Sequence, residues 1–134
     1  MFDLLVALCL YNEIVCRQQQ IINYAYKTAE FHQIDPNKFL GLISCESRFE
    51  ELAAGDYRSE TGEFMANGIL QFWFGSFRTY SKKFKIKGNY LDPFTQIDLA
   101  AHIIAYDKKG INNWYNCGKA VGFIETPLLA FKGS

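Results

Sequence analysis

Two helix-start signals, Asp35-Pro36 and Asp92-Pro93, constrain the fold more than any other feature of the sequence. In each signal the aspartate carboxylate caps free backbone amides, and the proline lacks an N–H that would have no partner in the first helical turn. The first signal predicts a helix that runs to about Phe49. The second predicts a helix that Gly110 is well placed to end. The chain is therefore expected to be mainly helical.

Apolar residues at helical spacing extend this expectation to most of the chain. Two further helical stretches are predicted over about residues 2–17 and 19–32, and they are either separate or continuous. A shorter helix, capped by Ser76, is predicted to run through about Phe84. The apolar stripes of these helices are Ile21, Tyr24, Ala25 and Thr28; Phe39, Leu42 and Ile43; and Ile97, Ala100, Ala101 and Ile104.

The segment from Glu50 to Gly75 has a different character, because glycines interrupt it and no helical period holds. It predicts a loop or a small β-hairpin, with a turn at Thr61-Gly62. No repeat, linker or low-complexity tract marks a boundary, so residues 1–134 are expected to form one domain. The predicted fold class is mainly α, with a helical body and a small β-containing flap. A groove between such parts suits an extended polymer.

The composition argues against some classes of function. Fourteen basic residues balance fourteen acidic ones, so no broad positive field favours nucleic acid, which is not an expected partner. The local run Lys82, Lys83, Lys85 and Lys87 is interpreted as a solvated face, the alternative being contact with an acidic polymer. No apolar run reaches the roughly 18 residues of a membrane span.

The N-terminal residues Met1–Leu10 are apolar, but Asp3 stands where an export signal needs positive charge. Residues 1–18 are therefore interpreted as a helix or as the remnant of a trimmed signal.

The four cysteines, Cys9, Cys16, Cys45 and Cys117, permit two disulfides but form no CxxC pair. The two histidines lie far from them in sequence, so no metal site, redox motif or cofactor is expected. Cys9 and Cys16 are seven residues apart and share a helix face, for which buried thiols are the favoured interpretation.

Glu46 is the candidate for acid/base chemistry. It follows Leu42 and Ile43 by four and three residues, which places it on or beside their apolar stripe. Desolvation there would raise its pKa from about 4.3 toward roughly 6, a value that suits a general acid. The alternative is a helix-end glutamate paired with Arg48 or a lysine, and periodicity leaves both open.

Four segments in order resemble the soluble lytic transglycosylase family of the lysozyme-like superfamily, over about residues 20 to 120. The segment 43–49 resembles the catalytic Glu-Ser motif, 53–56 resembles the chain leaving that helix, and 68–72 resembles the Gly-Leu-Met-Gln motif. Asp92-Pro93 with Ile97 and Ala100-Ala101 resembles a downstream helix, although Gln96 replaces its usual asparagine.

The resemblance implies a role for each matching residue. Glu46 would protonate the glycosidic oxygen of peptidoglycan and then take the proton of the C6 hydroxyl, giving a 1,6-anhydro sugar. Ser47 would orient the carboxylate or a sugar substituent, Gln71 would hydrogen-bond near the reacting sugar, and Gly68 would allow close backbone approach. Phe72, or a neighbouring aromatic, is a candidate for stacking on a sugar, although such residues are more often part of a core.

The C-terminal part admits two alignments. Trp114–Gly118 is similar to the family's Ala-Tyr-Asn-Ala-Gly motif, which would make Tyr115 a groove residue. A second subgroup closes with Trp-x-x-Cys, which fits Trp114 and Cys117 better and leaves Tyr115 peripheral.

Two rival functions stay open. A hydrolytic muramidase needs a second carboxylate, for which Asp56, Glu60 and Glu63 are candidates. A non-catalytic glycan-binding module would keep the groove without turnover. In each case the expected partner is the glycan strand of peptidoglycan, outside the cytoplasm, with a larger cell-wall-penetrating assembly as a further candidate.

Overall fold

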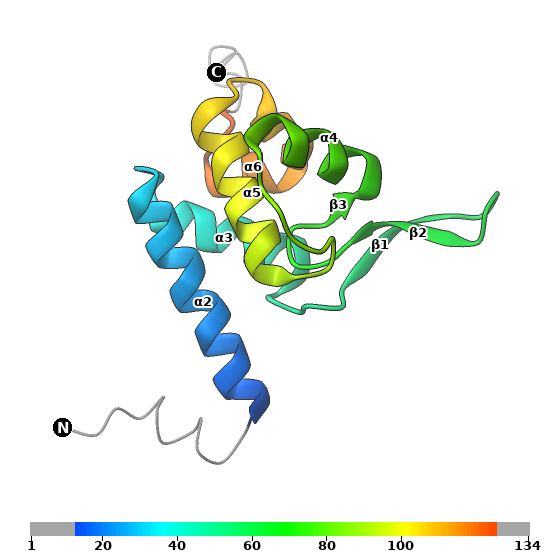
Figure 1. Ribbon diagram of the computed structural model, residues 1–134, viewed down its shortest axis with the longest axis horizontal. Coiled ribbons are helices and arrows are strands. Elements are labelled where there is room, and N and C mark those ends of the chain that lie inside the picture. Colours follow the sequence, from blue (N-terminus) through cyan, green and yellow to red (C-terminus); the bar gives the residue numbers. More distant parts are fainter. Residues whose placement is uncertain (1–12, 126–134) are drawn as a thin grey trace, which may run out of the picture.

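The computed structural model describes residues 13–125, and these residues form a helical body with a projecting β-hairpin (Figure 1). The fold class is mainly α with a small antiparallel sheet, as predicted for a lysozyme-like domain. The elements in chain order are α2 Glu13–Phe31, α3 Pro36–Ser47, β1 Ala54–Arg58, β2 Glu63–Asn67, β3 Phe72–Trp73, α4 Phe74–Phe84, α5 Pro93–Tyr106, the 3₁₀ helix Gly110–Trp114 and α6 Tyr115–Val121.

The helix α2 is continuous from Glu13 to Phe31, which confirms the continuous alternative over this range. No proline or glycine interrupts it. Its residues Ile21, Ala25 and Ala29 are fully buried, and the helix packs on α3 and α5. The predictions for residues 1–12, Cys9 among them, lie outside the described residues.

The start of α3 is as predicted, and its end comes two residues early. The carboxylate of Asp35 accepts hydrogen bonds from the backbone N–H groups of Asn37 at 2.9 Å and Lys38 at 3.3 Å. The helix ends at Ser47 because Arg48 and Phe49 have φ angles of 55° and 61°, in the left-handed region. This sharp turn directs the chain from α3 into the hairpin.

Two predicted helix boundaries are wrong. Ser76 does not cap α4, because the short strand β3 runs directly into the helix and Trp73 occupies the N-cap position without a side-chain hydrogen bond. Gly110 does not end α5, because the helix stops at Tyr106 and Asp107 has an extended backbone. Gly110 instead begins the 3₁₀ helix, where a side chain would overlap Ile103.

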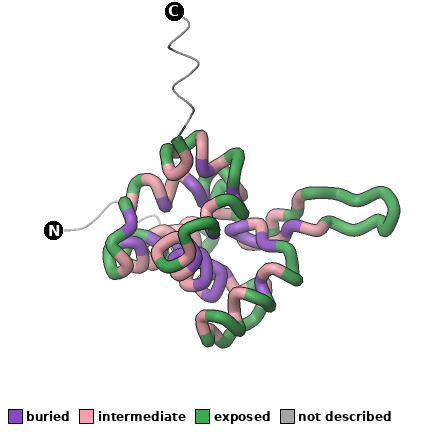
Figure 2. The backbone as a smooth tube through the Cα atoms, turned by 90° about the horizontal axis from the view of Figure 1, so that it is seen from above, coloured by how far each residue is buried: buried purple, intermediate pink, exposed green. Residues whose placement is uncertain are grey.

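The three strands form one antiparallel sheet in the order β1-β2-β3. Tyr57 pairs with Phe64, and Ala66 pairs with both Gly55 and Trp73. The N–H of Gly62 donates to the carbonyl of Arg58 at 2.8 Å, and the hairpin turn at Thr61-Gly62 is confirmed. Figure 2 shows the hairpin extending away from the buried centre of the body, with its distal part exposed.

The core is built from the facing sides of the helices and from the chain between β2 and β3. Ile69 and Leu70 of that connection are fully buried, so it is anchored in the body rather than free at the surface. The other fully buried large residues are Ile21, Phe39, Leu42, Ile43, Gln96, Ile97, Leu99 and Ile103.

A disulfide joins Cys45 of α3 to Cys117 of α6, across 72 positions of sequence. The sequence predicted neither this bond nor α6. Cys16 is also disulfide-bonded, so the interpretation of its sulfur as a buried thiol is wrong. The bond between Cys45 and Cys117 fixes the C-terminal end of α3 against α6.

We predict that replacing Cys45 and Cys117 together by serine lowers the free energy of unfolding by about 2 to 4 kcal/mol, because the long loop they close is free in the unfolded reduced chain. Urea denaturation monitored by circular dichroism measures this loss. The control is Ser44→Ala at the exposed neighbouring position. A double variant within about 0.5 kcal/mol of the wild type would contradict the prediction.

Candidate active site

Glu46 lies in the last turn of α3, next to Cys45, and its side chain is partly buried. The carboxyl group forms no hydrogen bond and no ion pair with any residue of the described range 13–125. The pairing with Arg48 that the sequence left open is therefore not formed. Glu46 is held beside the core without a compensating cation.

Burial raises the pKa of Glu46 to about 7, and desolvation of the charged form is the cause. The direction agrees with the expectation from the helical pattern, and the value lies above the roughly 6 expected. A carboxyl group with this pKa is populated in both forms near neutral pH. It can therefore donate a proton and, once ionised, accept one.

Contacts with other helices hold the backbone before and after Glu46. On one side, Cys45 is tied to α6 by its disulfide. On the other, Arg17 of α2 donates two hydrogen bonds to the carboxylate of Glu51, at 2.9 and 3.1 Å. These contacts hold the end of α3 and the turn that follows it, which limits the motion of the acid.

The hydroxyl of Ser47 is engaged within its own helix. It donates to the carbonyl of Ile43 at 3.3 Å, and the residue is 7% exposed. The proton of the Ser47 hydroxyl is thus used within the protein, and Ser47 forms no hydrogen bond with the Glu46 carboxyl group.

Gln71 fastens the hairpin to the loop that precedes β3. Its amide nitrogen donates to the carbonyls of Ala53 at 3.0 Å and Gly68 at 2.8 Å. Its Oε1 lies close to Gly55, where a side chain would crowd it, and accepts no hydrogen bond from a described residue. Gln71 therefore keeps one acceptor available in this part of the surface.

Gly68 makes room for a protein side chain. Its φ angle is 86°, and a Cβ atom there would overlap the amide group of Gln96. Gln96 is fully buried; its Oε1 accepts from the N–H of Leu70 at 2.8 Å, and its Nε2 donates to the carbonyls of Asn67 at 3.1 Å and Tyr90 at 2.7 Å. Sequence reasoning noted Gln96 only as a departure from the family pattern. A polar residue within a buried apolar stripe was the signal available.

Phe72, one of the aromatic residues considered for stacking on a sugar, lies in the core. Phe72 is 3% exposed, and its ring packs edge-on against Trp114, with centroids 5.4 Å apart, and against Phe77, 6.0 Å apart. A ring covered in this way has no face for a sugar. The neighbouring rings of Trp73 and Phe74 are 39% and 52% exposed.

Trp114 and Cys117 both contact segments of the candidate site, the first the connection between β2 and β3 and the second the end of α3. This supports the Trp-x-x-Cys alignment. The indole N–H of Trp114 donates to the carbonyl of Leu70 at 2.7 Å, and Cys117 holds Cys45. Tyr115 is 52% exposed at the start of α6, with the ammonium of Lys119 over its ring at 5.2 Å. Under this alignment Tyr115 is peripheral.

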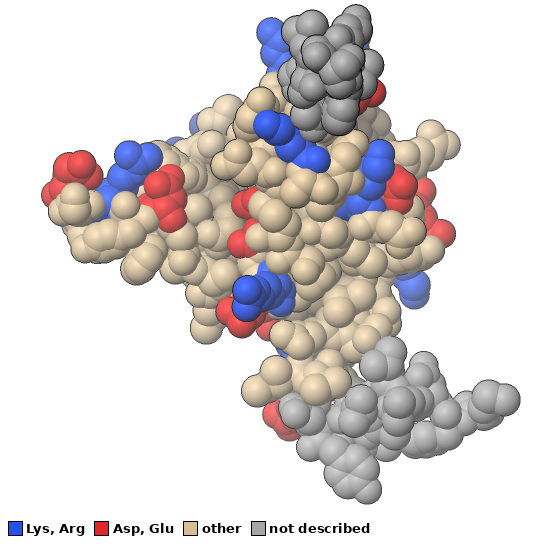
Figure 3. Space-filling view, turned by 180° about the vertical axis from the view of Figure 1, so that it is seen from behind, with Lys and Arg blue, Asp and Glu red and all other residues tan. Residues whose placement is uncertain are grey.

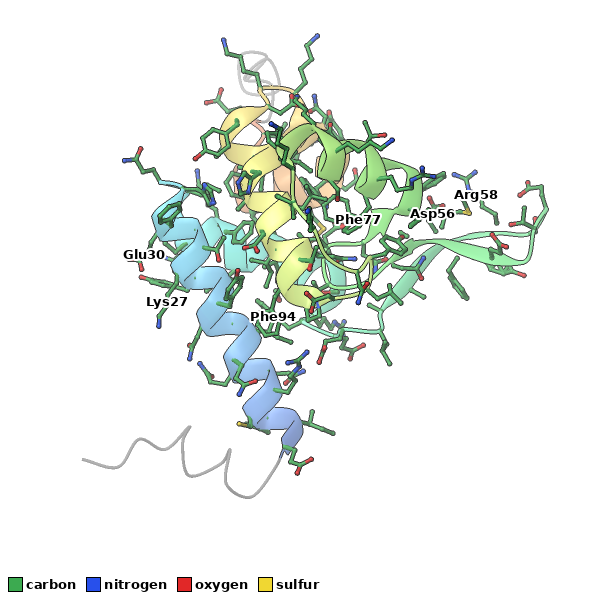
Figure 4. The ribbon with its side chains drawn as sticks, viewed as in Figure 1. Lys27, Glu30, Asp56, Arg58, Phe77 and Phe94 are labelled. Carbon is green, nitrogen blue, oxygen red and sulfur yellow. A yellow bond between two sulfur atoms is a disulfide. The ribbon has the colours of Figure 1, made fainter. Side chains whose placement is uncertain are left out.

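The hairpin carboxylates lie on exposed positions, as Figure 4 shows for Asp56. Asp56 pairs with Arg58 at 3.5 Å, and the Arg58 guanidinium lies 5.2 Å from the ring centroid of Trp73. Glu60 is in the hairpin turn and Glu63 begins β2, so both are at the end that projects from the body (Figure 1).

A hollow of about 540 Å³ lies away from Glu46. It is lined by residues from the end of α2, the start of α3 and the end of α5, with Phe31, Asp35 and Tyr106 among them, and Glu46 does not line it. Figure 3 shows basic and acidic side chains interspersed over one face of the molecule. Within residues 13–125, no three His, Cys, Asp or Glu side chains gather as a metal site, and no helix is long and apolar enough to cross a membrane.

A comparison with models of protein families shows which family the chain belongs to. The family model of the transglycosylase SLT domain matches residues 23–121. The chain belongs to this family. The matched range contains Glu46, Gln71, Gln96 and the Trp114–Cys117 brace, and an SLT domain has a function on peptidoglycan. No curated protein and no solved structure matched the chain.

We predict that Gln96→Ala lowers the free energy of unfolding by about 3 kcal/mol or more, because it leaves buried backbone groups without partners and opens a cavity. Urea denaturation measures the loss. Gln20→Ala, at an exposed position of α2, is the matched control and should change stability by less than about 0.5 kcal/mol. Equal stabilities of the two variants would refute the role given to Gln96.

A second prediction concerns the stability of the Glu46→Gln variant as a function of pH. The folded pKa of about 7 lies above the ordinary 4.5, so the wild type loses stability as pH rises through this window. Glutamine has no charged form to desolvate. The variant should therefore be more stable than the wild type by about 1 to 2 kcal/mol at pH 8, and the gain should shrink toward pH 4.5.

Chemical denaturation at a series of pH values measures this difference. Glu30→Gln, on the exposed face of α2, is the control and should show no such trend. A gain for Glu46→Gln that does not depend on pH would contradict the assigned burial.

Proposed function

We propose that this SLT domain is a peptidoglycan lytic transglycosylase in which Glu46 is the single general acid and base. The bond cleaved is the β-1,4 bond between N-acetylmuramic acid and N-acetylglucosamine. The observation that carries the proposal is the partly buried carboxyl group of Glu46, unpaired within the described residues and with a pKa of about 7.

The proton balance needs only this one group. Protonated Glu46 gives its proton to the glycosidic oxygen as the bond from C1 to that oxygen breaks, and the N-acetylglucosamine end leaves as an alcohol. The ionised carboxylate then takes the proton of the C6 hydroxyl as O6 bonds to C1. The product is 1,6-anhydro-N-acetylmuramic acid, Glu46 is protonated again, and no water is consumed.

The placement of the other carboxylates favours this reaction over hydrolysis. An inverting hydrolase needs a second carboxylate roughly 6.5 to 9.5 Å from the acid to activate water. Glu60 and Glu63 are at the projecting end of the hairpin, and Asp56 is paired with Arg58. A transglycosylase needs no such base, because its nucleophile is a hydroxyl of the substrate.

Substrate contacts are assigned to accessible groups on the loop and strand that follow the hairpin strand β2. We assign the Oε1 atom of Gln71 as an acceptor for a sugar hydroxyl or amide, and the exposed ring of Trp73 as a stacking surface. Gly68 and Ser47 have supporting roles: Gly68 leaves room for the Gln96 amide, and the Ser47 hydroxyl donates to a carbonyl of the last turns of α3. The glycan strand lies between the end of α3 and the hairpin, and the enzyme works outside the cytoplasm, where peptidoglycan is.

The test is digestion of purified peptidoglycan with mass analysis of the released fragments. The wild type should release fragments with anhydro ends, each lighter by one water than a hydrolysis product. Glu46→Gln should lower the rate by about 10²- to 10⁴-fold, since the positioned proton donor is gone. The wild-type rate should also fall as the pH rises above about 7, because the first step needs protonated Glu46.

Glu50→Gln, at an exposed position four residues later, is the control and should keep the wild-type rate. Fragments with new reducing ends would identify a muramidase. Binding of peptidoglycan without any cleavage by the wild type would identify a glycan-binding module.

A further inference from the structure

The exposed side of α4 carries a row of residues that the proposed reaction does not use. Gly75, Arg78, Thr79 and Lys82 follow one another at helical spacing and line an open hollow of about 260 Å³. Phe77, the buried residue of this helix, faces the core (Figure 4). The row therefore lies on the solvent side of the helix.

The segment of sequence that contains this row has charged side chains of one sign only. From Phe64 to Leu91 the sequence contains the five cations Arg78, Lys82, Lys83, Lys85 and Lys87, and no aspartate or glutamate. Lys83 pairs with Asp107 at 3.1 Å, whereas Arg78 and Lys82 have no ion pair within residues 13–125. Since the whole chain has a formal net charge of zero, the positive charge of residues 64–91 is a local excess, and three of its five cations lie on α4.

The row begins close to the candidate site along the chain. Gln71 is followed by β3, which runs directly into α4, so Gly75 lies only four positions beyond Gln71. The row from Gly75 to Lys82 covers seven helical rises, which is about 10 Å. That length equals about three residues of extended peptide.

We propose that Gly75, Arg78, Thr79 and Lys82 form a binding row for the carboxylates of the peptide stems of peptidoglycan. This rests on the proposed function, because the peptide stems belong to the same peptidoglycan strands that the domain is proposed to cleave. Guanidinium and ammonium groups bind carboxylates by charge-assisted hydrogen bonds. A Cβ atom at Gly75 would meet nothing within 4 Å, so a peptide backbone can approach closely there.

The geometry of Thr79 fits the same ligand. Its hydroxyl donates to the carbonyl of Gly75 at 3.0 Å, so its oxygen remains an acceptor for a peptide N–H. A row with cations for carboxylates and an acceptor for amides matches a short acidic peptide better than a neutral sugar.

The experiment measures binding to peptidoglycan by co-sedimentation, with Glu46→Gln in every protein to prevent turnover. Arg78→Glu/Lys82→Glu should weaken binding about tenfold at low salt, as expected for the loss of two partly exposed ion pairs. The difference should shrink as salt is raised, because exposed charges are screened. An amidase removes the peptide stems from the glycan strands. On such strands Glu46→Gln alone and Glu46→Gln with Arg78→Glu/Lys82→Glu should bind equally.

Lys27→Glu/Lys108→Glu, at exposed positions on other elements, makes the same change in net charge and should not weaken binding. Arg78→Gln/Lys82→Gln is a milder variant, for use if the charge reversal unfolds the protein. Equal binding of variant and control to intact peptidoglycan overturns the inference. A difference that persists on peptide-free strands also overturns it.

Failure of the two proposals can be told apart. If the chain with the native Glu46 releases anhydro fragments while substitutions at Arg78 and Lys82 leave binding unchanged, only the inference on α4 fails. If it neither cleaves nor binds peptidoglycan, the proposed function fails.

Discussion

A partly buried carboxyl group without a partner is unfavourable when it is charged. The candidate site depends on holding Glu46 in this position despite that cost. Desolvation raises the pKa of this group to about 7, so the folded protein holds it largely neutral at mildly acidic pH. A flexible helix end would let the side chain turn toward water and recover its ordinary pKa. The disulfide to α6 and the contact between Arg17 and Glu51 hold the chain on both sides of Glu46.

The second half of the candidate site depends on a different interaction. The connection between β2 and β3 has few regular backbone hydrogen bonds of its own, and the buried amide of Gln96 and the indole of Trp114 supply three of its partners. Gly68 is required because the Gln96 amide fills the space of its missing side chain. Gln71 then joins this connection to the start of the hairpin. The segment 68–72, which resembles the Gly-Leu-Met-Gln motif, therefore serves in large part to support the connection between β2 and β3.

The proposed reaction uses one group of the protein, the partly buried carboxyl group of Glu46. The exposed rings of Trp73 and Phe74 and the cations Arg78 and Lys82 lie on the segments that follow Gln71. The substrate itself provides the nucleophile in the proposed reaction, so the protein needs to position only one carboxyl group.

The sequence by itself determined the helices that begin at Asp35 and Asp92, the hairpin turn at Gly62, and the position of Glu46 beside an apolar stripe. These features depend on local rules of capping, turn geometry and periodicity, which act over a few residues. The tertiary structure alone decided that Phe72 is core, that Cys45 meets Cys117, and that Gln96 holds the loop of Gly68. Each of these depends on groups that are far apart in the chain and come together only when the helices pack, and no local pattern carries that information.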